Sequence, residues 1–310
     1  MLNRRKFLQR SLIAAGIAPL TQEVVREMLK SGEALKISVL HTNDVHSHID
    51  PFPDTHKRYP GKGGVQNRYT LIQKFRKENK NTLLFDCGDI FQGTPYFNLY
   101  GGELELKLMS KMGYDAATMG NHDFDNGMEG FLAVKKHAKF PFVCSNYDFS
   151  ETILRNQILP FKVFNKSGIK IGVFGIGIEL EGLVDKKLYG KTVYKNPIQV
   201  ANDYATKLRH EQGCELVICL SHLGYKYAND KISDLELAKH TSGIDLILGG
   251  HTHTFMEKAE FVRNSKGKEV LINQVGWAGI NLGKVDFYFS KLSKKRLNVS
   301  ETNKGFVEIN

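Results

Sequence analysis

The sequence has few cysteines and no long apolar run beyond its N-terminus. Cys87, Cys144, Cys214 and Cys219 are its cysteines among 310 residues, and no two have Cys-x-x-Cys spacing. A thiolate-rich metal site is therefore excluded, and we expect buried free thiols, with disulfides left open for an exported protein. No stretch of about 18 apolar residues follows the N-terminus, so we expect no stable transmembrane helix.

An excess of acidic residues is also lacking. The 43 Lys and Arg residues exceed the 33 Asp and Glu residues, which gives a formal charge of +10 at pH 7. A basic balance suits an anionic partner, such as a phosphorylated substrate, a membrane surface or a nucleic acid. The basic residues are scattered, and the densest cluster spans only residues 291–296. We interpret them as a solvated face and expect no nucleic-acid partner.

The first residues resemble an export signal. Arg4 and Arg5 precede Phe7, Leu8 and a short apolar stretch, which is typical of a twin-arginine signal. The alternative is an ordinary basic amphipathic helix. We expect residues 1–34 to be an export signal with a connecting segment, and the protein to lie in the periplasm or on the outer face of the inner membrane. Whether the signal is cleaved stays open.

From residue 35 onward, strand-like and helix-like stretches alternate. Helices are predicted at 65–79, 103–112, 128–138 and 196–213, the last with Asn196 as N-cap and Pro197 in its first position. Strands are predicted at 35–44, 82–89, 114–122, 140–147, 214–222 and 244–253, with a hairpin at 161–178. The last 55 residues or so are predicted to be β-structure. Their aromatic residues, including Trp277, are expected mostly to fill strand faces. This alternation predicts an α/β fold with sheet at its core.

Side chains that bind metals recur where the predicted strands end. Five strand-like runs deliver them at their carboxyl ends: Asp44, His46, Asp89, Asn121, His122, His222, His251 and His253. Ligands of open α/β sheets bind beyond the carboxyl ends of strands, so we expect these side chains to converge in space. His251 and His253 are expected on one face of an extended strand. Each motif alone is also consistent with a polar turn, but together they predict a metal site.

The donor atoms narrow the choice of metal. Histidine, aspartate and asparagine without cysteine form a mixed nitrogen and oxygen set, which suits Zn, Mn, Fe or Co. These ligands are too many for a single catalytic ion that must keep an open position. Two divalent ions that share a carboxylate fit better, because such a pair clamps the attacking and leaving oxygens of an in-line displacement.

In their order and context, these motifs resemble those of the calcineurin-like metallophosphoesterases. The motifs are Asp-x-His at 44–46, Gly-Asp at 88–89, Gly-Asn-His-Asp at 120–123, the single His222 and Gly-His-Thr-His at 250–253. Residues 36–290 are similar to the catalytic domain of the 5′-nucleotidase family within that group. The resemblance implies a β-sandwich flanked by helices, in four α/β/β/α layers, formed by a catalytic domain at residues 35–310.

The resemblance also implies a role for each residue of the motifs. One ion would be bound by Asp44, His46, Asp89 and His253, and the other by Asp89, Asn121, His222 and His251. Asn121 and His122 would contact the substrate. A metal-bridging hydroxide would attack phosphorus in line, while His122, oriented by Asp125, protonates the leaving oxygen. Asp123 stands where the nucleotidases often carry Glu, and it is not a ligand in that family.

The expected substrate is a phosphate ester, with a nucleotide favoured. Nucleotidases of this type carry a second, C-terminal domain that stacks the base, and we expect its role to fall to a separate substrate-domain protein. Three alternatives stay open: a 2′,3′-cyclic phosphodiesterase, a general phosphodiesterase, and a catalytic subunit that needs a substrate-binding partner for turnover.

Overall fold

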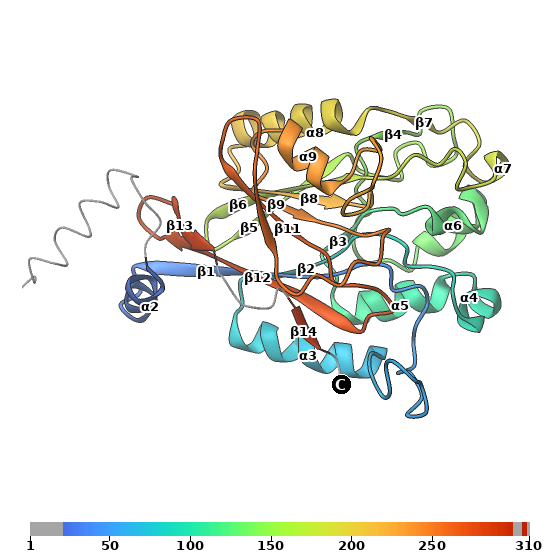
Figure 1. Ribbon diagram of the computed structural model, residues 1–310, viewed down its shortest axis with the longest axis horizontal. Helices are drawn as coiled ribbons and strands as arrows, with labels where there is room; N and C mark the ends of the chain where they lie inside the picture. Colours follow the sequence, from blue (N-terminus) through green and yellow to red (C-terminus); the bar gives the residue numbers. More distant parts are fainter. Residues whose placement is uncertain (1–20, 300–305, 309–310) are drawn as a thin grey trace, which may run out of the picture.

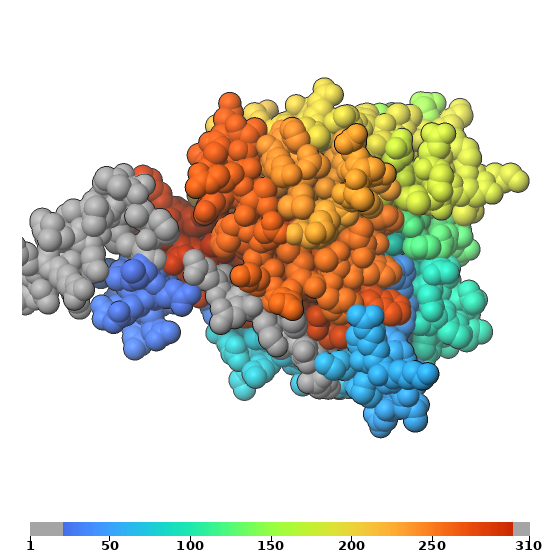
Figure 2. Space-filling model, in the orientation of Figure 1, coloured from blue at the N-terminus to red at the C-terminus, as the bar shows by residue number. Residues whose placement is uncertain are grey.

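Two stacked sheets with helices on both outer faces make up the described part of the chain (Figure 1). The structure is a computed structural model that describes residues 21–299 and 306–308. Helix α2 (Gln22–Lys30) lies at one end of the molecule (Figure 2). Its Val25 packs against Ala34 and Leu297. The expected export signal falls mainly in residues 1–20, which lie outside the described residues.

The first sheet has β1 (Ala34–Thr42) near its middle. On one side β1 pairs in parallel with β2 (Thr82–Asp86), which pairs in parallel with β3 (Ala116–Ala117). On its other side β1 is antiparallel to β12 (Asn281–Ser290), which pairs with β13 (Arg296–Val299) and β14 (Phe306–Glu308). The links between the parallel strands contain α3 (Val65–Glu78), α4 (Pro95–Tyr100) and α5 (Glu103–Met112). The carboxyl ends of β1, β2 and β3 therefore meet at one edge.

The second sheet is parallel at its centre and antiparallel at its edges. Its order is β10-β11-β9-β8-β6-β5. The parallel strands are β6 (Ile169–Ile176), β8 (Leu216–Ser221), β9 (Leu246–Leu248) and β11 (Glu269–Asn273). The antiparallel edge strands are β5 (Phe161–Lys166) and β10 (Glu260–Arg263). Helices α8 (Pro197–Thr206), followed by a π-helical turn (Lys207–Glu211), and α9 (Asp234–His240) cover its outer face.

Apolar residues on both faces of the strands build the core. In β1, Val39 belongs to the buried cluster between the two sheets, together with Val173 and Ile218. Leu40 belongs to the cluster on the outer face, together with Ile72 of α3. Successive residues are apolar because both faces of a parallel sheet are covered. The result is the four-layer α/β/β/α arrangement, so the predicted fold class is confirmed.

Shorter elements complete the layer around the first sheet. They are the 3₁₀ turn η1 (His122–Phe124), α6 (Gly127–Lys135), α7 (Lys186–Tyr189), and the paired strands β4 (Tyr147–Asp148) and β7 (Val193–Tyr194). The helix predicted at 196–213 begins as expected, because the Asn196 side chain accepts hydrogen bonds from the amides of Ile198 and Gln199. All four cysteines are free and buried, as predicted.

Several predicted strands are too long. The strand expected at 114–122 is reduced to two residues, and the stretch at 140–147 forms only isolated bridges before β4. The strands expected to end at residues 44, 89, 222 and 253 end at Thr42, Asp86, Ser221 and Leu248. The physical reason lies in the backbone, since Asp44, Asp89 and His251 have positive φ angles of 50°, 54° and 71° that no strand adopts.

Candidate dinuclear metal centre

The loops that leave the parallel strands bring the predicted ligands together. The segment after β1 runs beside the segment after β2, because the amides of Asp44 and His46 donate to the carbonyls of Gly88 and Asp89. The loop after β9 joins them, since the amide of His251 donates to both carboxylate oxygens of Asp44 at 2.9 and 3.0 Å. Residues more than two hundred positions apart in sequence thus meet at one edge of the two sheets.

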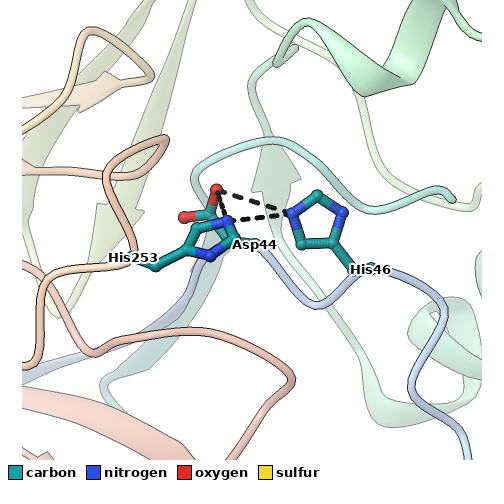
Figure 3. A group of neighbouring side chains, drawn as sticks. All are labelled: Asp44, His46 and His253. Atoms are coloured by element: carbon teal, nitrogen blue, oxygen red, sulfur yellow. Dashed lines mark hydrogen bonds and ion pairs between the residues drawn. The ribbon is translucent and has the colours of Figure 1, made fainter. Parts of the chain in front are cut away.

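Asp44, His46 and His253 form the first group of candidate ligands. Oδ1 of Asp44 lies 3.9 Å from Nε2 of His46 and 3.3 Å from Nε2 of His253, and these two nitrogens are 3.1 Å apart (Figure 3). The Asp44 side chain is fully buried, whereas that of His253 is 41 % exposed. All three donor atoms therefore point at one position that is open to solvent from one side.

Asp89, His222 and His251 form the second group. Oδ2 of Asp89 lies 3.1 Å from Nε2 of His222, and Asn121 joins the group because its Oδ1 lies 2.9 Å from Nδ1 of His251. The same Asp89 oxygen lies 3.8 Å from Nε2 of His46. Asp89 consequently faces both groups, which is the position of a carboxylate that could be shared between two ions.

Glycines allow this close approach. A Cβ atom on Gly88 would lie 2.5 Å from the amide nitrogen of Gly120, and one on Gly250 would lie 2.8 Å from Nδ1 of His222. Both distances are shorter than real Cβ contacts, so a larger residue would push the loops apart. The expectation that His251 and His253 share one face of an extended strand is wrong, because both have positive φ and their rings belong to different groups.

Backbone carbonyls and one buried carboxylate orient the candidate ligands. Nδ1 of His46 lies 3.2 Å from the carbonyl of Phe91, and Nδ1 of His222 lies 2.6 Å from that of Cys87. Such contacts fix the ring so that the other nitrogen faces the metal. Asp123 is buried and accepts hydrogen bonds from three amides, those of Asp89, Ile90 and Gly120, at 3.1, 3.0 and 2.8 Å.

Burial and neighbouring charges shift the pKa values of the candidate ligands. Burial alone would raise the pKa of Asp89, but the neighbouring histidines, His222 foremost, together outweigh it and hold that pKa well below its usual range. Burial lowers the pKa of His251 to about 4 and also lowers that of His46, which favours the neutral imidazole that binds metals. Within the described residues, the buried Nε2 of His222 has no well-aligned hydrogen-bond partner. The donor set therefore fits divalent ions.

His122 and Asp125 lie beside the two groups without joining either. Nδ1 of His122 is 2.8 Å from Oδ2 of Asp125, and this hydrogen bond is the main cause that raises the pKa of His122. The amide of His122 donates to Oδ1 of Asp89 at 2.8 Å, which places its ring near the ligands. With a side chain 37 % exposed, His122 can meet a molecule that enters from solvent.

A cavity of about 330 Å³ opens over the centre. Its lining combines predicted site residues with residues that were not predicted: His46, Asp89, Gln92, Gly93, Asn121, His122, His251, His253 and Trp277. The prediction omitted Gln92, Gly93 and Trp277, and it gave no task to Asp123. The signal for Asp123 was present, since an acidic residue directly follows the Gly-Asn-His motif. Trp277 had no such signal, because its position depends on a loop far from the motifs in sequence.

Comparisons with known proteins identify the family that the chain resembles. A family profile for calcineurin-like phosphoesterases matches residues 37–255. The chain is 32 % identical over 288 residues to the trifunctional nucleotide phosphoesterase protein YfkN of Bacillus subtilis, which covers 82 % of this chain and 18 % of that protein. It is 33 % identical over 231 residues to the snake venom 5′-nucleotidase of Crotalus adamanteus, covering 72 % of this chain and 38 % of that one.

A solved structure shows the same fold. The crystal structure of a 5′-nucleotidase precursor from Thermus thermophilus superposes with a TM-score of 0.79 and 28 % identity, over 89 % of this chain and 55 % of that one. The chain spans less than half the length of the two curated relatives above. Among the described residues, no helix combines the length and the apolar character needed to cross a bilayer.

Proposed function

The chain belongs to the calcineurin-like phosphoesterase family and is a phosphoric ester hydrolase, and on this basis we propose that it hydrolyses nucleotide phosphate esters with two divalent metal ions. One observation carries the proposal. Two groups of candidate ligands meet at Asp89, and the His122–Asp125 pair lies beside them over one cavity. This arrangement provides both a place for a phosphate group and a proton donor next to it.

In this proposal every metal-binding residue comes from the two groups and their neighbour Asn121. Asp44, His46 and His253 would hold one ion, His222, His251 and Asn121 the other, and Asp89 both. Bound ions of this kind polarise a phosphate and lower the pKa of water. The mixed nitrogen and oxygen donors suit Zn, Mn, Fe or Co.

His122 is proposed to act as the general acid. The hydrogen bond to Asp125 fixes the proton on Nδ1 and raises the pKa of His122, so that the ring stays protonated to a higher pH than a free histidine. Its Nε2 then carries a second proton that it can give to the leaving oxygen of the ester. Asn121, which lines the same cavity, would bind the phosphate together with His122.

The substrate class rests on the relatives and on the size of the cavity. The relatives are named as nucleotide phosphoesterases and 5′-nucleotidases. A cavity of about 330 Å³ is at the small end of ligand sites, which fits a phosphate group better than a whole nucleotide. We therefore include in the proposal a separate substrate domain that holds the base. The Bacillus relative is named a trifunctional nucleotide phosphoesterase, so the second candidate is a broader activity on phosphate esters, with the phosphodiesterase among them.

Export is part of the same proposal. Arg4 and Arg5 with Phe7 and Leu8 fit a twin-arginine signal, whose pathway carries folded proteins, and the protein would then act in the periplasm. Cell fractionation of a variant with both arginines changed to lysine measures this directly. The proposal predicts that the variant stays in the cytoplasm, and unchanged localisation would remove the export step.

The experiment that tests the catalytic proposal measures metal and hydrolysis on the same sample. The purified chain should contain two divalent ions and should release phosphate from a nucleoside monophosphate or an aryl phosphate, or open a cyclic nucleotide to its monophosphate. Chelation should abolish that activity. His240 is an exposed histidine on α9, so His240→Ala serves as a matched control for replacing a histidine of the centre, such as His122→Ala. A chain that hydrolyses none of these esters with two ions bound would overturn the proposal.

A further inference from the structure

The imidazole of His253 lacks the hydrogen bond that orients other histidines of the centre. The Nδ1 atoms of His46 and His222 each face a backbone carbonyl, at 3.2 and 2.6 Å. His253 uses Nε2 toward Asp44 and His46, and across residues 21–299 and 306–308 its Nδ1 has no hydrogen-bond partner. A ring that is 41 % exposed and has no such bond needs another means of staying in place.

Trp277 supplies a parallel surface for this ring. The centroids of the two rings are 5.7 Å apart and their planes differ by 2°, which is a stacked arrangement. The contact between His46 and His253, in contrast, is edge-on at 65°. Stacking on an indole face restricts the tilt of an imidazole but leaves both of its nitrogens free.

The backbone and the neighbouring rings hold Trp277 firmly. The amide of Ala278 donates to the carbonyl of Asp44, and the amide of Gly276 donates to the carbonyl of Thr254. The loop that carries Trp277 is thereby tied to both segments that provide the first ligand group. The indole also contacts the rings of His48 and Phe52, both edge-on, with ring centroids 5.1 and 6.0 Å away.

We propose that Trp277 is a positioning residue that stacks on His253 and so sets the affinity of one of the two metal sites, the one formed with Asp44 and His46. The inference rests on the proposed two-metal centre. The site of His222 and His251 does not depend on this stack, because a carbonyl holds the His222 ring. Loss of Trp277 should therefore lower the affinity for one ion and leave the affinity for the other unchanged.

Titration of the metal-free protein with Zn²⁺ against a fluorescent chelator measures both affinities. Trp277→Leu keeps an apolar side chain but removes the flat ring, and we expect one affinity to fall by about 10- to 100-fold, the size typical of losing an orienting partner. Trp277→Phe keeps a ring and should recover most of that loss. Tyr59→Leu is the matched control. Tyr59 stacks on Phe255 and contacts Phe52, a neighbour of Trp277, but it has no ring contact with His253.

Two double variants identify the site that is weakened. Adding His46→Ala to Trp277→Leu should change the stronger of the two affinities little, whereas adding His222→Ala should abolish that affinity. Equal losses at both sites, or a Trp277→Leu protein with both wild-type affinities, would overturn the role of Trp277. A wild-type protein that binds a single Zn²⁺ ion would instead overturn the two-metal centre itself. Circular dichroism of each metal-free variant shows whether it is folded. If Trp277→Phe and Trp277→Leu lose the same affinity, the loss comes from the smaller side chain and not from the missing ring.

Discussion

Replacing Asp123 with Asn should loosen the metal centre although Asp123 touches no proposed ion. Its Oδ2 accepts from the amides of Asp89 and Gly120, and its Oδ1 accepts from the amide of Ile90. In Asp123→Asn the carboxamide oxygen can replace only one of these atoms, so its NH₂ group must face at least one amide donor. Losing a hydrogen bond and burying two donors that face each other without an acceptor costs about 2–4 kcal/mol.

Thermal unfolding of the metal-free variant measures that cost. At about 2–4 °C per kcal/mol, the midpoint should fall by about 4–16 °C. Metal affinity should fall as well, by about 10- to 100-fold, because the Asp89 segment loses its anchor. Asp203→Asn, on the exposed face of α8, is the control and should change neither quantity. If Asp123→Asn melts with the wild type and binds metal equally well, the three hydrogen bonds do not hold the loops.

Further predictions concern single side chains. Asp89→Asn should reduce the metal content below two ions per chain and abolish hydrolysis, and a variant with full content and turnover would show that Asp89 is not shared. His122→Ala should keep both ions but lose turnover by roughly 10²–10⁴, the usual contribution of a general acid; metal loss as steep as in Asp89→Asn would make His122 a ligand. Burial lowers the pKa of His41 from 6.5 to about 3, so between these pH values the unfolded chain binds a proton that the folded chain does not. Stability should therefore fall as the pH decreases through this window, by up to about 1.4 kcal/mol per pH unit. Urea midpoints measured from pH 7 to pH 5 should show a shallower slope for His41→Gln, and an identical slope would contradict this assignment.

The order of elements and the identity of the converging residues could be predicted from sequence, because both depend on local patterns. Apolar runs mark strands that are covered on both faces, and polar residues at their carboxyl ends mark the edge where loops meet. The start of α8 at Asn196 was also readable, since capping is a local hydrogen bond. The geometry of the loops could not be predicted from sequence, because it depends on contacts between distant segments. Trp277 was expected to fill a strand face, yet it lies in a loop after β11 and lines the cavity.

The same loops explain why predicted strands extended too far. Five of the proposed ligands have φ angles between 48° and 71°: Asp44, His46, Asp89, His251 and His253. This conformation costs a residue with a side chain roughly 1–2 kcal/mol, so five of them together cost roughly 5–10 kcal/mol. That sum is comparable with the whole stability of an ordinary domain, about 5–15 kcal/mol.

Interactions around the ligands must therefore offset this strain. Asp123 holds the Asp89 loop, and the side chain of Gln274 bonds the carbonyl of Gly250 and the amide of Thr254. Any ion that binds the folded chain but not the unfolded one adds to that stability, by about 2.7 kcal/mol at a hundredfold excess over its Kd. The backbone that points five side chains at one edge is thus an unfavourable one. It persists because buried hydrogen bonds, and the proposed ions with them, stabilise the fold in which those side chains meet.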